Sequence, residues 1–74
     1  MRIEFTREQV EKVYDEIDRR AEMFATECNY MVDDAEIKDY RNAMLQGVYG
    51  TLMTLASNWW AVRTITDEIE EERY

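Results

Sequence analysis

The sequence predicts an all-α fold, and three observations support this. The chain of 74 residues contains no proline and only two glycines, Gly47 and Gly50, which is too few for the tight turns of a β-rich chain. Apolar residues recur at spacings of three and four through two long segments, as they do on one face of a helix. Helix-capping residues stand at the start of each segment. We therefore expect one helical domain, residues 1–74, in which two long helices form an antiparallel hairpin.

Residues 1–5 alternate polar and apolar side chains, so we expect an extended N-terminal arm or a short strand there. A helix is expected to begin directly after Thr6. Thr6 and Gln9 have the spacing of a capping box, and Phe5 can pack on Val10 as a hydrophobic staple. The apolar side chains of this helix form one face: Val10, Val13, Tyr14, Ile17, Ala21, Phe24 and Cys28.

A turn is expected between the two helices, from Asn29 to Asp34, with Asn29 as the C-terminal cap of the first. Asp33 and Glu36 repeat the capping-box spacing at the start of the second helix, where acids also favour the positive end of the helix dipole. A calcium site is the alternative interpretation of these acids. Their spacing does not match an EF-hand loop and no glycine lies among them, so we interpret them as capping residues.

The second helix is expected from about Ala35 to at least Ala56. It contains most of a neutral segment, Asn42 to Val62, whose 21 residues carry no charge in a chain that is 35% charged. One apolar stripe along it is Leu45, Val48, Leu52, Leu55, Trp59 and Val62; a second, about 100° away, is Tyr49, Met53, Ala56 and Trp60. Because a helix that is uncharged all round is normally buried, the neutral segment is predicted to be covered, and Trp59 to lie in a core.

The residues after Asn58 allow two structures. The apolar register continues through Thr66 and Ile69, which favours a helical extension of the second helix to about Arg73. The β-branched and aromatic residues of this segment lower its helix propensity, and Thr66 followed by two acids has the pattern of a cap for a short third helix. The sequence leaves both alternatives open.

Seventeen acidic and nine basic residues give a net charge of −8, and many of the acids fall into two sets. The acidic stripe lines one face of the first helix at spacings of three and four: Glu8, Glu11, Asp15, Asp18 and Glu22. The acidic tail lies near the C-terminus: Asp67, Glu68, Glu70, Glu71 and Glu72. Both are predicted to bind a basic partner surface, and the alternative is a solvated surface that aids solubility.

Two bases of the first helix are placed to pair with the acidic stripe. Lys12 lies four residues after Glu8, and Arg19 stands in the same relation to Asp15. The other three acids of the stripe have no base four residues later: Glu11, Asp18 and Glu22. These three are therefore the best candidates for contact with a partner.

Self-association is also expected. A chain this short buries only about 60% of its unfolded surface, and the lone Cys28 cannot form an intramolecular disulfide. On a helix, Trp59 and Trp60 point about 100° apart and cannot both enter one seam. The predicted oligomer interface is Tyr49, Met53, Trp59 and Trp60. The small residues around Gly47 would let a second helix approach closely.

Several functions are excluded by composition. There is no histidine and no Gly-rich phosphate loop, and Cys28 falls on the apolar face, so the sequence predicts no catalytic residue, cofactor or metal site. The negative charge argues against direct binding to nucleic acid or to an anionic membrane. Polar residues inside the neutral segment argue against a transmembrane helix, and no signal peptide is visible. The single cysteine suits a cytoplasmic location.

The expected function is that of a small acidic, non-enzymatic module that blocks or adapts a basic surface of a partner protein, a nucleic-acid-binding enzyme being one such partner. In size, acidity and lack of catalytic groups the chain resembles the small inhibitors encoded by phages and mobile elements. That resemblance implies an inhibitor that imitates nucleic acid. The alternative is a structural subunit of an obligate helical homo-oligomer whose acidic exterior only aids solubility.

Overall fold

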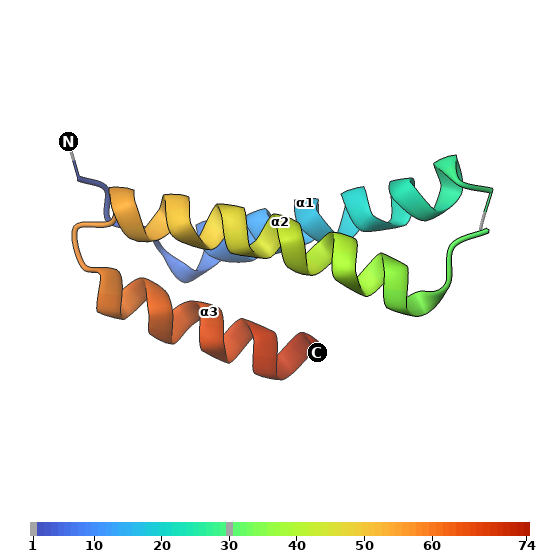
Figure 1. Ribbon diagram of the computed structural model, residues 1–74. Coiled ribbons are helices and arrows are strands. Elements are labelled where there is room, and N and C mark those ends of the chain that lie inside the picture. The colour runs from blue at the N-terminus through green and yellow to red at the C-terminus, as the bar shows by residue number, and fades with distance from the viewer. Residues whose placement is uncertain (1, 30) are drawn as a thin grey trace.

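The computed structural model describes residues 2–29 and 31–74, and this part of the chain is all-helical, with three helices: α1 (Arg7–Glu27), α2 (Asp34–Leu55) and α3 (Trp59–Arg73). In Figure 1, α2 lies alongside α1 over most of its length, and α3 lies beside this pair at the end where α1 begins. The α1–α2 turn is at the other end and extends well beyond the C-terminus of α3 (Figure 1). The molecule is elongated, with extents of 41 × 25 × 17 Å.

The start of α1 confirms the predicted capping box. The Thr6 side chain accepts a hydrogen bond from the Gln9 N–H at 3.2 Å, and the Thr6 N–H donates to Gln9 Oε1 at 2.9 Å. Phe5 packs against the cluster that contains Val10, as a hydrophobic staple requires. Four members of the predicted apolar face are buried: Val10, Tyr14, Ile17 and Ala21. Ala25, which the sequence analysis did not assign to this face, is buried as well.

The C-cap of α1 is Cys28, one residue before the predicted Asn29, and the N-cap of α2 is Asp33 as predicted. Asn29 adopts a left-handed backbone conformation, φ 53°, directly after the last turn of α1, where such a residue commonly ends a helix. Asp33 is the N-cap of α2 and accepts a hydrogen bond from the Glu36 N–H at 2.8 Å. Asp33 therefore caps α2 as expected, through one of the two hydrogen bonds of the predicted capping box.

The C-terminal segment is a separate third helix, which settles the alternative that the sequence leaves open. The break lies earlier than the Thr66 pattern suggests. Ala56 is extended, with φ −69° and ψ 136°, and Asn58 caps α3 by accepting a hydrogen bond from the Ala61 N–H. Thr66 lies inside α3 and is only 2% exposed.

The extended N-terminal arm holds this break in place. The Ile3 N–H donates to the Leu55 carbonyl and the Ser57 N–H donates to the Ile3 carbonyl, both at 2.8 Å. These two bonds form a single parallel β-bridge between Ile3 and Ala56. Ala56 is 1% exposed beneath the arm. The arm thus gives backbone groups near the end of α2 the partners that a continuing helix would otherwise provide.

Two clusters of buried residues form the core. One joins Val10 and Tyr14 of α1 to Ile69 of α3, and the other contains Leu52, Ala56 and Val62. Phe5 packs against both clusters. The arm is therefore part of the core that connects α3 to α1 and α2.

The prediction that Trp59 lies in a core is wrong within the single chain, where its side chain is 52% exposed. The break at Ala56 changes the direction of the chain, so Trp59 no longer continues the stripe that ends at Leu55. The stripe resumes in α3, where Val62 is buried. The neutral segment as a whole is not covered either, since only Leu52, Ala56 and Val62 of it are buried.

Candidate functional site

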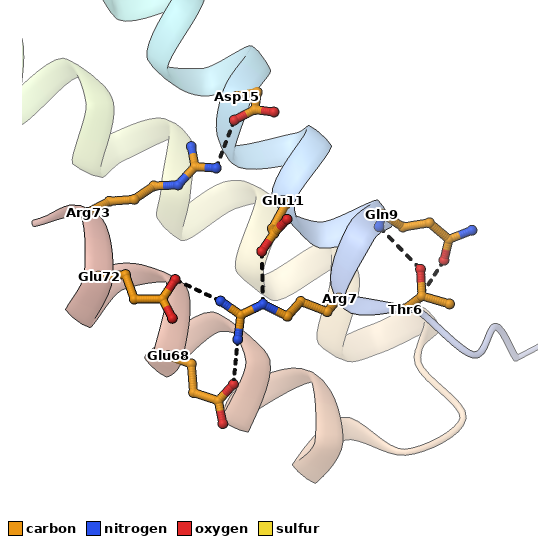
Figure 2. Close-up of polar contacts among 8 residues, drawn as sticks. All are labelled: Thr6, Arg7, Gln9, Glu11, Asp15, Glu68, Glu72 and Arg73. Carbon is orange, nitrogen blue, oxygen red and sulfur yellow. Dashed lines mark hydrogen bonds and ion pairs between the residues drawn. The ribbon is translucent and has the colours of Figure 1, made fainter.

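Part of the acidic stripe of α1 lies near part of the acidic tail of α3, and Arg7 lies between them (Figure 2). Its guanidinium forms ion pairs with three carboxylates: Nε with Glu11 at 2.8 Å, Nη1 with Glu68 at 2.8 Å, and Nη2 with Glu72 at 2.7 Å. These contacts raise the pKa of Arg7, with the hydrogen bond to Glu11 as the largest cause. One base thus neutralises part of both acidic sets.

Arg73 forms a second bridge between the same helices. Its guanidinium contacts Asp15 at 2.7 Å and Asp18 at 3.1 Å, and the Asp15 contact is drawn in Figure 2. The Tyr74 hydroxyl donates to Asp18 at 2.6 Å. Burial, and then this hydrogen bond, raise the pKa of Tyr74 to about 12. The middle of the acidic stripe is therefore occupied by groups from the end of the chain.

These contacts correct one premise of the sequence analysis. Glu11 and Asp18 are predicted to lack basic partners, but they pair with Arg7 and Arg73. The prediction considered only bases four residues later on the same helix. Arg7 lies four residues before Glu11, and Arg73 comes from another helix. Among the described residues no ion pair involves Glu22, the third candidate, which is exposed.

The predicted pairs within α1 are half correct. Lys12 lies 3.6 Å from Glu8, as expected. Arg19 pairs with Glu16 instead of Asp15, and Arg20 pairs with the same carboxylate at 3.0 Å. These bonds, first that from Arg19, lower the pKa of Glu16 to about 2.

Three of the five acids in the acidic tail also have partners within the chain. Besides the pairs of Glu68 and Glu72 with Arg7, Glu70 accepts a hydrogen bond from the buried Tyr14 hydroxyl at 2.8 Å. Asp67 and Glu71 are exposed and have no ion pair within the described residues. Glu68, Glu70 and Glu72 thus have intramolecular partners, which offset their unfavourable position in the helix dipole.

A third acidic region, around the α1–α2 turn, has no such bridges. We call residues 21–40 the α1–α2 tip. Its acids outnumber its one base, Lys38, by six to one: Glu22, Glu27, Asp33, Asp34, Glu36 and Asp39. All six are exposed, and none forms an ion pair within the part of the chain that the structure describes. Met31, 86% exposed, lies among them.

Of the four residues of the predicted oligomer interface, Trp59 and Trp60 of α3 contact each other, and Tyr49 and Met53 lie on α2. Trp59 and Trp60 contact each other edge to face, with ring centroids 5.3 Å apart, and Trp60 is 60% exposed. Arg63 lies over the Trp60 ring at 5.5 Å. Tyr49 is exposed on α2, whereas Met53 packs against the Leu52 cluster. Whether these residues meet a second copy remains a prediction.

A feature that the sequence analysis missed is an open groove between α1 and α2. Its volume is about 550 Å³ and its lining is mostly apolar. The apolar lining residues are Val13, Ile17, Ala43, Met44, Gly47 and Val48. The sequence contains a signal for this groove. Val13 belongs to the predicted apolar face of α1 but lies at its edge, beside the residues that contact α3, and it lines the groove.

The described residues contain no group of three or more histidine, cysteine, aspartate or glutamate side chains placed to hold a metal ion. Cys28 is a free, half-buried thiol. None of the described helices combines the length and the apolar character that crossing a bilayer requires. The chain matches no family model, no curated protein and no solved structure.

Proposed function

We propose that this protein is a small, non-enzymatic binding module that engages a basic surface of a partner protein through the α1–α2 tip. The distribution of unpaired carboxylates supports this proposal. Six acids against one base place a net charge of −5 on residues 21–40, out of −8 for the chain. Because no arginine or lysine bridges these carboxylates within the described residues, their charge is available to a partner.

The shape of the molecule supports the same surface. The turn end of the tip extends beyond the end of α3, so a partner can approach that end directly (Figure 1). At its inner end, Glu22 and Ile37 line the same pocket as Tyr74. Exposed apolar side chains lie within it: Met23, Met31 and Tyr40. Methionine is flexible and adapts to varied contact surfaces, and the surrounding acids would steer a basic partner toward it.

The acidic stripe and the acidic tail have a secondary role in this proposal. Arg7 and Arg73 already occupy most of the stripe, so a partner would have to displace them. Glu22, at the end of the stripe, belongs to the tip and joins the main contact. A nucleic-acid-binding surface is one basic surface that the tip would suit, and the protein would then act as an inhibitor of the phage type.

The structural-subunit alternative is favoured by a different observation. Of the neutral segment, only Leu52, Ala56 and Val62 are buried, which leaves a large uncharged surface for a second copy. The two functions use different surfaces and are not exclusive.

Affinity capture with three baits tests the proposal. The tip variant carries Glu22→Lys, Glu27→Lys and Asp39→Lys. The control carries Glu4→Lys, Asp67→Lys and Glu71→Lys, three exposed acids outside the tip. Both variants raise the net charge by the same six units, so an effect of total charge alone would be equal in the two.

We expect basic proteins from the native host lysate to be retained by the wild type and by the control, and to be lost from the tip variant. Retention by the wild type should fall steeply with salt, because surface electrostatics are screened within about 10 Å at 0.1 M. Equal retention by the wild type and the tip variant would contradict the proposal. If the control variant alone failed to retain the basic proteins, the binding surface would instead lie on the acidic tail and the arm.

A further inference from the structure

The groove between α1 and α2 lies on the side of this pair that α3 does not cover. On α1, Tyr14 packs against Ile69 of α3, and Val13, one residue earlier, points about 100° away into the groove. On α2, Leu45 packs against the same cluster, and Met44 lines the groove. One face of the α1–α2 pair is therefore covered by α3, while the other exposes apolar side chains.

The surroundings of the groove are unlike the rest of this acidic molecule. On α1 the groove is lined by two bases and one acid, Lys12, Arg20 and Glu16, and each of them forms an ion pair within α1. On α2 the lining residues Ala43, Met44, Gly47 and Val48 belong to the neutral segment. Two copies of a chain with net charge −8 repel each other over most of their surface, but this face is close to neutral.

The charge distribution favours a second copy over another partner at this face. A basic partner would be attracted to the α1–α2 tip, where the unpaired carboxylates lie. The α1 lining offers bases and an acid in alternation, and a surface that carries both signs can complement itself when a two-fold axis brings a base of one copy near the acid of the other.

Gly47 lies in the lining of the groove. Apart from its chain neighbours and the backbone of its own helix, a Cβ atom at Gly47 would meet no atom within 4 Å, so packing inside the molecule does not require a glycine there. At a helix crossing it allows close approach.

We propose that a second copy of this chain packs on the groove. The α1–α2 pairs of the two copies would lie face to face across a two-fold axis and form a four-helix core, with α3 of each copy on the outside. This assembly leaves the α1–α2 tip of each copy free, so it is independent of the proposed binding function and would present two tips to a partner.

Substitutions at the groove test the assembly. Gly47→Glu introduces a charge into the groove, and the open space around Gly47 means that the single chain accommodates it. Ala43→Glu is a second variant in the same lining. Gln46→Glu is the matched control, because it adds the same charge on the same helix but does not line the groove. Trp60→Glu tests the exposed tryptophans as a competing interface.

The measurement is the mass in solution by sedimentation equilibrium at about 10 to 200 µM, with helicity measured by circular dichroism. We expect the wild type, Gln46→Glu and Trp60→Glu to show twice the chain mass of 9.0 kDa. The two groove variants should be monomeric with unchanged helicity. A monomeric wild type at 200 µM would overturn the proposal. So would a groove variant that stays dimeric, or a Trp60→Glu variant that alone becomes monomeric, because the second copy would then dock elsewhere.

Discussion

Two acidic regions of this molecule have similar composition but different environments. Where α1 faces α3, Arg7 and Arg73 lie between the carboxylates and form ion pairs with them. At the α1–α2 tip, six carboxylates surround one base, and no ion pair joins them within the described residues. The comparison shows that the number of acids in a segment does not decide which are available to a partner. The position of α3 decides it, because α3 brings Arg73 to α1 and brings Glu68 and Glu72 to Arg7.

The largest expected difference between these regions is the loss of unfolding free energy when an isoleucine is truncated to alanine. Ile69→Ala removes a 1% exposed side chain that joins α3 to α1, so we expect a loss of about 3 kcal/mol of unfolding free energy. Ile37→Ala is the matched change at the tip, where Ile37 is only half-buried, and should cost about 1 kcal/mol. Urea denaturation of both variants measures the difference. Equal losses would mean that α3 contributes no more to the core than the tip does.

Removal of the Arg7 guanidinium is the next largest change. Arg7→Met leaves Glu11, Glu68 and Glu72 facing one another without their base, so we expect a modest loss of stability at low salt, as is usual for solvent-exposed ion pairs. Lys38→Met, which removes the one base of the tip, serves as the control and should change stability little. If the loss at Arg7 did not shrink in high salt, it would come from packing of the side chain instead of its charge.

The Tyr14 hydroxyl, which joins α1 to Glu70 of α3, should make the stability of this contact depend on pH. Burial, and then its hydrogen bond to Glu70, raise the pKa of Tyr14 above its ordinary value of 10.0. Since the folded-state pKa is the higher one, this stabilisation is fully present below pH 10 and is lost as the pH rises toward the folded pKa. Tyr14→Phe should cost about 1 kcal/mol near neutral pH and should flatten the alkaline loss of stability.

Urea midpoints between pH 8 and about 11 test this prediction. Tyr40→Phe at the tip is the control, since the Tyr40 side chain is exposed and stacks on Phe24 through its ring. An alkaline slope of the same size in wild type and Tyr14→Phe would show that other groups cause it, Tyr74 being the first to consider because its pKa is also raised.

The smallest expected effect has the opposite sign. Glu27 is the last residue of α1, whose last turn contains no base, so its charge opposes the helix dipole. Glu27→Lys should therefore stabilise the fold by about 0.3–0.5 kcal/mol, measurable as a small rise in melting temperature. Glu11→Lys, on the paired face of the same helix, should destabilise it because it places a lysine beside Arg7. Destabilisation by Glu27→Lys would indicate that the tip contains a stabilising contact of this carboxylate.

The features that could be predicted from the sequence are those with local determinants. The N-terminus of α1 depends on Phe5, Thr6, Gln9 and Val10, which lie within six positions, and its capping box and staple are confirmed. The N-cap at Asp33 is equally local. The all-α class follows from spacings that are visible within each segment.

The features that could not be predicted depend on contacts between distant residues. The break at Ala56 has no proline or glycine to mark it, and it is held by Ile3 from the other end of the chain. Arg7 and Glu68 are 61 positions apart. A rule that pairs each acid with a base four residues later on the same helix misses Arg73, which comes from α3, and also misses Arg7, which lies four residues before Glu11. The apolar register that places Trp59 in a core does not continue past the break.

The bridge between Ile3 and Ala56 also bears on the order in which the chain folds. Helix formation and the α1–α2 turn need only local contacts, which form quickly, whereas the bridge must close a loop that spans most of the sequence. Its two hydrogen bonds can therefore form only after α2 has ended at Leu55 and the arm has reached it. The Ser57 N–H donates to Ile3, so we expect it to be protected from solvent exchange once the chain has closed. Exchange at this single backbone amide would then report on completion of the fold.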